Sequence, residues 1–125
     1  MRNSYTVGSV TGYASIGGLI GYTYGDVIEN CYSRGDVTGT GSYIEGLIGR
    51  NYYNSTYGSS TITNSYYDSE TAGQSDTGKG SPRTTKQMQE GTADTTIDGS
   101  NMYTDWDTTI WDFGSDSDYP SLSWE

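Results

Sequence analysis

The stretch Gly46-Leu47-Ile48-Gly49 repeats an earlier stretch of the chain, Gly18-Leu19-Ile20-Gly21, residue for residue. An isoleucine stands two places before the first glycine of each copy, Ile16 before the first and Ile44 before the second. The interval from Gly18 to Gly46 lies in the range that is typical of stacked structural repeats, in which each unit buries its apolar residues against a neighbour. The sequence therefore predicts a repeat protein.

A second marker opens each unit, namely an asparagine followed by Ser or Cys and then Tyr. The asparagines are Asn3, Asn30 and Asn64, and the second interval between them is longer than the first. Asparagine tolerates left-handed backbone at a corner, and its amide can also stack on the asparagine of the next unit. Either alternative predicts that these residues occupy equivalent places in successive units.

The segments between the glycines have β character, and none has the apolar spacing of an amphipathic helix. About three strands of ~5 residues and three turns fit in one period. We therefore expect an all-β fold, a β-solenoid (parallel β-helix) of about two and a half coils over residues 1–67. Its interior is predicted to hold Val10, Ile16, Ile20, Ile28, Val37, Ile44, Ile48 and Ile62.

The alternation along each strand predicts which side chains face outward. Leu19 and Leu47 have the parity opposite to the isoleucines, so they are expected to face outward unless a bulge turns them in. Tyr5, Tyr32 and Tyr66 are expected on the solvent side, where structural stacking as an aromatic ladder is favoured over a tyrosine stripe that binds sugar.

Composition and charge exclude several classes of function. The chain has 125 residues, 6 basic against 16 acidic residues, and no histidine. A nucleic-acid-binding protein needs a basic footprint, and an anionic membrane surface also attracts basic segments. Because the chain is acidic, no nucleic-acid partner is expected. No stretch resembles a membrane-spanning helix, so no membrane insertion is expected either.

Cys31 is the single cysteine, which excludes an internal disulfide. It occupies the place that Ser4 and Ser65 take in the other units. A small buried side chain is therefore favoured over a reactive thiol.

The second unit carries an insertion within residues 50–58, and an insertion of this kind forms a loop on one face. The loop contains Tyr52, Tyr53 and Tyr57, which suit contact with carbohydrate or protein. The alternative is that the loop folds back over Leu47 or a neighbouring face.

Residues 68–125 differ from the repeats and are predicted to form a segment that caps the solenoid. A polar connection leads to one short helix near residues 84–90, where Thr84 and Gln87 have capping-box spacing and Gly91 ends the helix. Large aromatic side chains bury much surface, so Trp106, Trp111 and Trp124 are expected to pack on the last coil. Several aspartates of this segment could bind calcium or lie in solvated loops, and they match no EF-hand spacing: Asp105, Asp107, Asp112, Asp116 and Asp118. Solvated loops are favoured, so no metal site is predicted, and no cofactor is expected.

With residues 30–39 followed by the second Gly-Leu-Ile-Gly, the chain resembles the GLUG-motif repeat proteins, and its end resembles their C-terminal region. The resemblance extends to residues 66–74, 84–88, 111–112 and 119–124, although Tyr67 stands where the family has Trp and residues 81–83 are inserted. It implies a β-solenoid in a large, adhesin-like protein, secreted or on the surface of a bacterium or archaeon. It supplies no catalytic residues.

Three functional hypotheses follow. The first is a non-enzymatic structural or adhesive module of a surface protein or extracellular fibre. The second is a carbohydrate-binding module that uses the loop tyrosines and contacts surface glycans. The third is an enzyme that degrades polysaccharides, which needs paired carboxylates in a groove.

The first coil is expected to have an open edge, because only Arg2 stands near Asn3 to block it. Open β edges pair with other chains unless charge, proline or a covering element prevents it. The expected partners are other repeats of the same protein or further copies of the chain.

Overall fold

The computed structural model describes residues 1–89, 102–115 and 117–125. Within these residues the strands are many and the two helices short, so the fold is all-β as predicted. The chain divides into two compact units, Met1–Arg83 and Thr84–Glu125, and each is described by itself.

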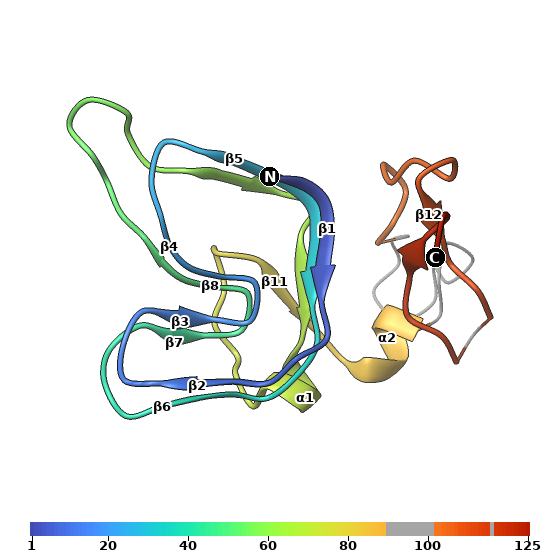
Figure 1. Cartoon of the computed structure of the whole chain (residues 1–125), viewed down its shortest axis with the longest axis horizontal. Helices are drawn as coiled ribbons and strands as arrows, with labels where there is room; N and C mark the ends of the chain where they lie inside the picture. The colour runs from blue at the N-terminus through green and yellow to red at the C-terminus, as the bar shows by residue number, and fades with distance from the viewer. Residues whose placement is uncertain (90–101, 116) are drawn as a thin grey trace. The chain divides into compact units, whose positions relative to one another are not determined.

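The first unit is built from two successive passes of the chain along the same course (Figure 1). The first pass comprises β1 (Arg2–Thr6), β2 (Val10–Gly12), β3 (Ile16–Gly17) and β4 (Ile20–Thr23). The second pass comprises β5 (Val27–Ser33), β6 (Val37–Gly39), β7 (Ile44–Glu45) and β8 (Ile48–Asn51). Each strand of the first pass pairs in parallel with its counterpart, β1 with β5, β2 with β6, β3 with β7 and β4 with β8.

The spacing of the sequence repeats sets the register of these strand pairs, because equivalent residues of the two repeats lie side by side. Val10 lies beside Val37 and Ile16 lies beside Ile44, so the offset between partners grows by one position from the first pair to the second. The extra position lies in the connection between β6 and β7, residues 40–43, which is longer than the equivalent connection between β2 and β3, residues 13–15. The variation in length is therefore absorbed in the turns.

A third layer covers only part of the second pass. β9 (Thr61–Thr63) and β10 (Tyr66–Asp68) both pair in parallel with β5, and β11 (Ser81–Arg83) pairs in parallel with β10. Together with β1 these four strands form one five-stranded sheet, and the other pairs form two-stranded sheets. None of these sheets closes among the described residues. Residues 68–83 thus continue the first unit, and its boundary lies after Arg83 instead of after Tyr67.

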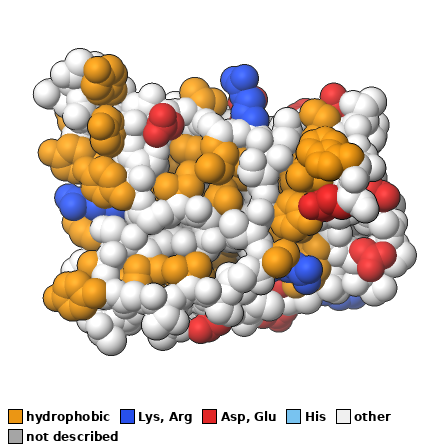
Figure 2. Space-filling model, viewed as in Figure 1, with side chains coloured by type: hydrophobic (Ala, Val, Ile, Leu, Met, Phe, Trp, Pro, Cys, Tyr) orange, Lys and Arg blue, Asp and Glu red, His pale blue; other side chains and the backbone are white. Residues whose placement is uncertain are grey.

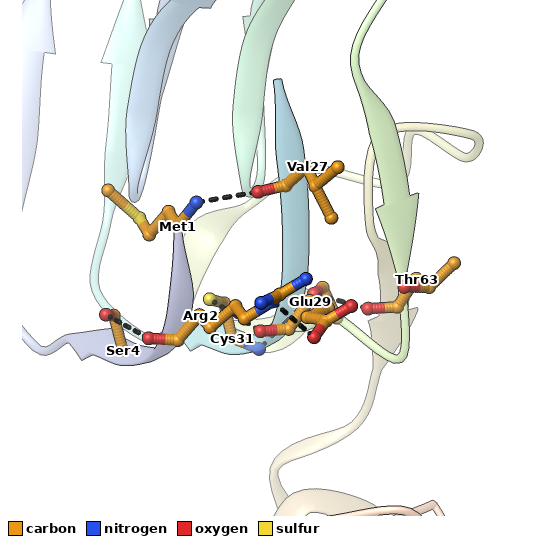
Figure 3. A network of polar contacts seen from close by, with 8 residues as sticks. Met1, Arg2, Ser4, Val27, Glu29, Cys31 and Thr63 are labelled. Atoms are coloured by element: carbon orange, nitrogen blue, oxygen red, sulfur yellow. Dashed lines mark hydrogen bonds and ion pairs between the residues drawn. The ribbon is translucent and has the colours of Figure 1, made fainter.

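The three repeat asparagines are left-handed corners. Asn3, Asn30 and Asn64 have φ of 50°, 54° and 45°, the first of the two alternatives considered from the sequence. The next residue then donates a hydrogen bond to the carbonyl oxygen two residues before it, and Figure 3 shows the first two of these bonds. The bonds run from Ser4 to Arg2 (2.9 Å), from Cys31 to Glu29 (3.2 Å) and from Ser65 to Thr63 (2.8 Å).

Cys31 therefore replaces a serine hydroxyl as the donor at its corner. Its side chain is buried, and burial raises the pKa of the thiol above its ordinary value. This agrees with the expected small buried side chain.

The interior of the first unit holds the predicted aliphatic side chains. Four of them are buried, namely Ile16, Ile28, Val37 and Ile48. The other four are partly buried and pack against these, namely Val10, Ile20, Ile44 and Ile62.

Leu47 was expected to face outward unless a bulge turned it in, and the structure shows the second alternative. Its side chain is 0% exposed and belongs to the core, and Leu19 packs partly buried against the same core. The reason is a bend between β7 and β8, at which Leu19 and Ile20 both donate to the carbonyl oxygen of Leu47. The bend interrupts the strand alternation, so that Leu47 and Ile48 both reach the interior, as in the bulge alternative.

Tyr32 was also expected to face solvent, but it is only 1% exposed. It lies beside Tyr5 in the sheet, and the two rings stack with centroids 5.0 Å apart and planes 8° apart. Tyr66 occupies the next register position, with the guanidinium of Arg83 5.4 Å from its ring. The tyrosines thus share one row of the sheet, although not a solvent-exposed one.

Residues 69–80 close the far side of the second pass. α1 (Ser69–Ala72) begins at Asp68, which accepts hydrogen bonds from the N–H groups of Glu70 and Thr71, and ends at left-handed Gly73. Sequence analysis missed this helix and predicted only one. The signal was present in the N-cap aspartate and the glycine that ends the helix.

Side chains that follow α1 form hydrogen bonds with backbone groups of the second pass to which a further pass would otherwise bond. The carboxylate of Asp76 accepts from the N–H of Gly46 at 2.7 Å, and the amide of Gln74 donates to the carbonyl of Val37 at 2.9 Å. The ring of Tyr67 lies against Gly46, and its hydroxyl donates to the carbonyl oxygen of Asp76 at 2.8 Å. Side chains, not a third Gly-Leu-Ile-Gly, therefore close this edge.

The second unit contains the predicted helix. α2 (Thr85–Gln89) carries a capping box, because Thr84 accepts from the N–H of Gln87 and Gln87 accepts from the N–H of Thr84. The expected end of the helix at Gly91 lies outside the described residues. β12 (Trp111–Asp112) and β13 (Ser121–Leu122) form an antiparallel pair.

Aromatic side chains form the centre of the second unit. Trp106 and Trp111 are buried with ring centroids 4.5 Å apart, and Trp106 also packs against Tyr103. Trp124, by contrast, is 70% exposed. That Trp106, Trp111 and Trp124 pack on the last coil stays a prediction.

Candidate functional site

The outer side of β4 and β8 carries an exposed group of tyrosines around one arginine. Tyr22 of β4 and Arg50 of β8 lie beside each other in the parallel pair. Both follow the Gly-Leu-Ile-Gly bend directly, so the bend sets their position. Figure 2 shows hydrophobic side chains gathered, with a basic one among them, on the side where β4, β8 and the 52–60 loop lie.

The guanidinium of Arg50 lies among three aromatic rings. Its Cζ is 4.6 Å from the ring centroid of Tyr43, 5.2 Å from that of Tyr52 and 5.8 Å from that of Tyr22. All are within the range of cation–π attraction. Among the described residues Arg50 has no carboxylate partner, so these rings are what hold it.

The rings also contact one another. Tyr22 and Tyr52 stack with centroids 6.0 Å apart, and Tyr24 lies edge-on to Tyr22 at 6.2 Å. Tyr57 extends the row, with its centroid 6.3 Å from that of Tyr24. We call this group the Arg50 surface; it consists of Arg50, Tyr22, Tyr24, Tyr43, Tyr52 and Tyr57.

The sequence anticipated part of this surface. Of the three loop tyrosines, Tyr52 and Tyr57 belong to it, whereas Tyr53 is exposed and makes no ring contact with a described residue. Sequence analysis missed Tyr22, Tyr24, Tyr43 and Arg50. The spacing of the two Gly-Leu-Ile-Gly copies was the available signal, because it aligns Tyr22 with Arg50 and Tyr24 with Tyr52.

The loop after β8 projects beyond the shorter connection of the first pass (Figure 1). Asn54 and Gly58 pair across it, and the Asn54 side chain accepts from the N–H groups of Thr56 and Tyr57. At its base, Asn51 exchanges two 2.8 Å hydrogen bonds with the backbone of Ser60. The loop is thus folded through its own hydrogen bonds, and it presents its tyrosines outward.

A second polar group lies at the closed end of the first unit. Lys79 pairs with Glu45 at 3.0 Å and also donates to the carbonyl of Gly49. Burial raises the pKa of the Glu45 carboxyl; Lys79 opposes this shift and nearby Asp76 adds to it. Burial likewise raises the pKa of the Tyr67 hydroxyl. These side chains form hydrogen bonds and an ion pair with the backbone and with one another, which indicates a structural role.

Three of the aspartates considered for calcium stabilise turns in the second unit, and Asp116 lies outside the described residues. Asp107 accepts from the N–H and hydroxyl of Thr109, Asp112 from the N–H of Gly114, and Asp118 from the N–H of Ser115. These bonds lower the pKa of Asp107 and Asp118. Within the described ranges no three potential ligands of the His, Cys, Asp and Glu types come together.

No helix in the described part of the chain has the length and apolar character needed to cross a bilayer.

Comparison with known proteins identifies a known motif in these repeats. The model of the GLUG motif matches residues 12–38, which run from the end of β2 through β3, β4 and β5 into β6. This chain carries the GLUG motif. The match contains the first Gly-Leu-Ile-Gly, so the GLUG unit corresponds to one pass of the structure.

The chain is also similar to a protein of Evansella cellulosilytica named "Putative Gly-rich membrane protein". The two are 40% identical over 124 residues, which is 96% of this chain and 13% of the relative. The chain therefore spans about an eighth of the length of that relative. No solved structure matches the chain.

Proposed function

We propose that this chain is a non-enzymatic, adhesive structural module in which GLUG units stack as a β-solenoid. The support is the parallel, in-register pairing of all four strands of one pass with those of the next. Stacked units of this kind bury a core that no single unit can form.

The two ends of the stack differ. Among the described strands, β2, β3 and β4 each pair with a single partner, on the side of the second pass. The other side of the second pass is occupied by residues 69–80, through Gln74, Asp76 and Lys79. Another GLUG unit, or a second copy of the chain, therefore adds at the first pass and not at the closed end.

The proposed location is the bacterial or archaeal cell surface. The similar protein is named a membrane protein, and this chain spans a small part of its length. An extracellular repeat array anchored elsewhere in a long protein is consistent with both facts.

The test is a chain with one additional copy of residues 1–27 placed ahead of Met1. If units stack, the longer chain unfolds in one transition at a higher temperature, and amides of the original β2 to β4 gain protection from hydrogen exchange. The control carries Ser in place of Ile16 and Ile20 within the added copy only. An added copy that stays unprotected, and leaves the transition unchanged, contradicts the proposal.

The second candidate is a carbohydrate-binding module. Exposed aromatic patches on soluble proteins mark interaction sites, and the Arg50 surface is such a patch. Screening the intact chain against a glycan array tests this candidate. Absence of any bound glycan overturns it without affecting the stacking proposal.

A further inference from the structure

The Arg50 surface combines a cation with no carboxylate partner among the described residues and five tyrosine rings. The chain has a net charge of −10, so carboxylates that could pair with an arginine are plentiful. Arg50 nevertheless contacts aromatic rings instead. A cation–π contact places the guanidinium over the face of a tyrosine ring and uses none of its N–H groups as hydrogen-bond donors. The N–H groups at the edge of the Arg50 guanidinium therefore remain available to an acceptor.

We propose that the Arg50 surface binds an acidic polysaccharide, with a uronate carboxylate on Arg50 and neighbouring sugar rings on the tyrosines. This inference rests on the second candidate function and is independent of the stacking of GLUG units. It names both the charge of the ligand and the residue that recognises it.

Charge complementarity selects the carboxylate. A guanidinium presents two parallel N–H donors that match the two oxygens of a carboxylate, and such pairs are stronger than neutral hydrogen bonds. No acidic side chain of the described residues pairs with Arg50. The ligand therefore supplies the anion that the protein does not.

The tyrosines select a sugar polymer over a more highly charged one. The C–H faces of pyranose rings are apolar and stack on aromatic rings, while sugar hydroxyls bond to the tyrosine hydroxyls. Nucleic acids require several cations to replace the counterions of successive phosphates, and the Arg50 surface has one. A chain of sugars with spaced carboxylates fits one arginine between several rings.

The surface is fixed in advance by the strands. Tyr22 and Arg50 are register partners, and Tyr52 follows the end of β8 directly. Tyr43 has a φ of 63°, a left-handed conformation that is uncommon for a bulky side chain. That conformation accompanies the shortest ring distance to Arg50, 4.6 Å. Fixed rings and a fixed cation reduce the entropy lost on binding.

The test compares one polymer with and without its charge. Polygalacturonate is the acidic probe, and its fully methyl-esterified form is the matched neutral probe. We expect the intact chain to bind polygalacturonate in calorimetry and to bind the ester about tenfold more weakly or not at all. Poly-glutamate tests whether any flexible polycarboxylate suffices, and we expect no binding to it.

Variants assign the binding to the surface. Arg50→Gln and Tyr52→Ala are each expected to weaken polygalacturonate binding about tenfold, because one removes the cation and the other a stacking ring. Lys86→Gln and Tyr13→Ala, which remove a cation and an exposed ring elsewhere, are expected to leave it unchanged. Circular dichroism of each variant checks that it folds.

The outcomes separate the hypotheses. Equal binding of polygalacturonate and its ester, or binding that survives Arg50→Gln in a folded protein, overturns the inference while carbohydrate binding stands. Equal binding of poly-glutamate overturns it in favour of an acidic protein partner. No binding to either polygalacturonate form overturns it as well, and the glycan array then decides whether the second candidate also fails.

Discussion

The hydroxyl of Ser33 donates a 2.9 Å hydrogen bond to the carbonyl oxygen of Gly46, from β5 to the bend of the second pass. One pass earlier, Thr6 donates a 2.8 Å hydrogen bond to the carbonyl of Gly18. Thr6 and Ser33 are register partners, so the same bond recurs with the repeat. These hydroxyls tie the sheet of β1 and β5 to the Gly-Leu-Ile-Gly bend.

Replacing Ser33 by Ala is expected to lower the free energy of unfolding by about 1 kcal/mol, the usual net value of one buried hydrogen bond. Urea denaturation measures it. Ser9→Ala, at an exposed position, is the control and is expected to change stability by less than about 0.5 kcal/mol. Equal stability of the two variants would show that the bond is dispensable.

Gly46→Ala is expected to destabilise the first unit by about 1–3 kcal/mol. An added Cβ would overlap the ring of Tyr67, which closes the end of the stack. Gly8→Ala is the matched control, since a Cβ there meets open space. Thermal unfolding of both variants checks this, and a Gly46 variant as stable as the Gly8 variant contradicts the packing.

The thiol of Cys31 is expected to resist alkylation in the folded chain. It is buried, donates to the carbonyl of Glu29, and has a pKa raised by burial, so little thiolate forms at pH 8. Mass spectrometry after treatment with iodoacetamide measures the labelled fraction. Labelling should appear only in denaturant, and rapid labelling of the native protein would refute the assignment.

Glu45 is expected to make stability fall as pH rises. Because its folded-state pKa lies above the ordinary 4.5, the folded chain holds this proton more tightly than the unfolded chain. Its contribution is therefore complete below pH 4.5 and is lost as pH rises through the raised value. Glu45→Gln does not titrate, so the stability of that variant relative to the parent should increase across this window. A relative stability that is constant or decreases would show that Lys79 dominates.

Deletion of residues 100–125 tests the capping role of the aromatic segment. Ordering this polar segment costs about 1–2 kcal/mol per residue, which docking of its aromatics offsets. We expect the shortened chain to aggregate, as light scattering would show. A shortened chain that is monomeric and equally heat-stable would mean that residues 69–80 close the stack without help.

The repeated features of this fold could be predicted, because each occurs twice in the sequence. The pairing of Val10 with Val37 and of Ile16 with Ile44 follows from the spacing alone. The position of Leu47 does not, since a bend that breaks the strand alternation leaves no periodic signal. The closure by Asp76 is likewise unique among the described residues, and so is the contact of Arg50 with Tyr43. Features that occur once are fixed by tertiary geometry, which one sequence does not encode as a pattern.

The connection between β8 and β9, residues 52–60, is three times as long as the one between β4 and β5, residues 24–26, yet Ile28 and Ile62 remain side by side. The pairing of β5 with β9 therefore does not depend on the length of the connection, provided that Asn51 and Ser60 still form the hydrogen bonds at the base of the loop. Each unit of a long array could carry a different exposed peptide at this corner without disturbing its neighbours. An architecture of this kind separates the surface that diversifies under selection from the scaffold that must be conserved, and it offers residues 54–58 as a place to graft foreign epitopes.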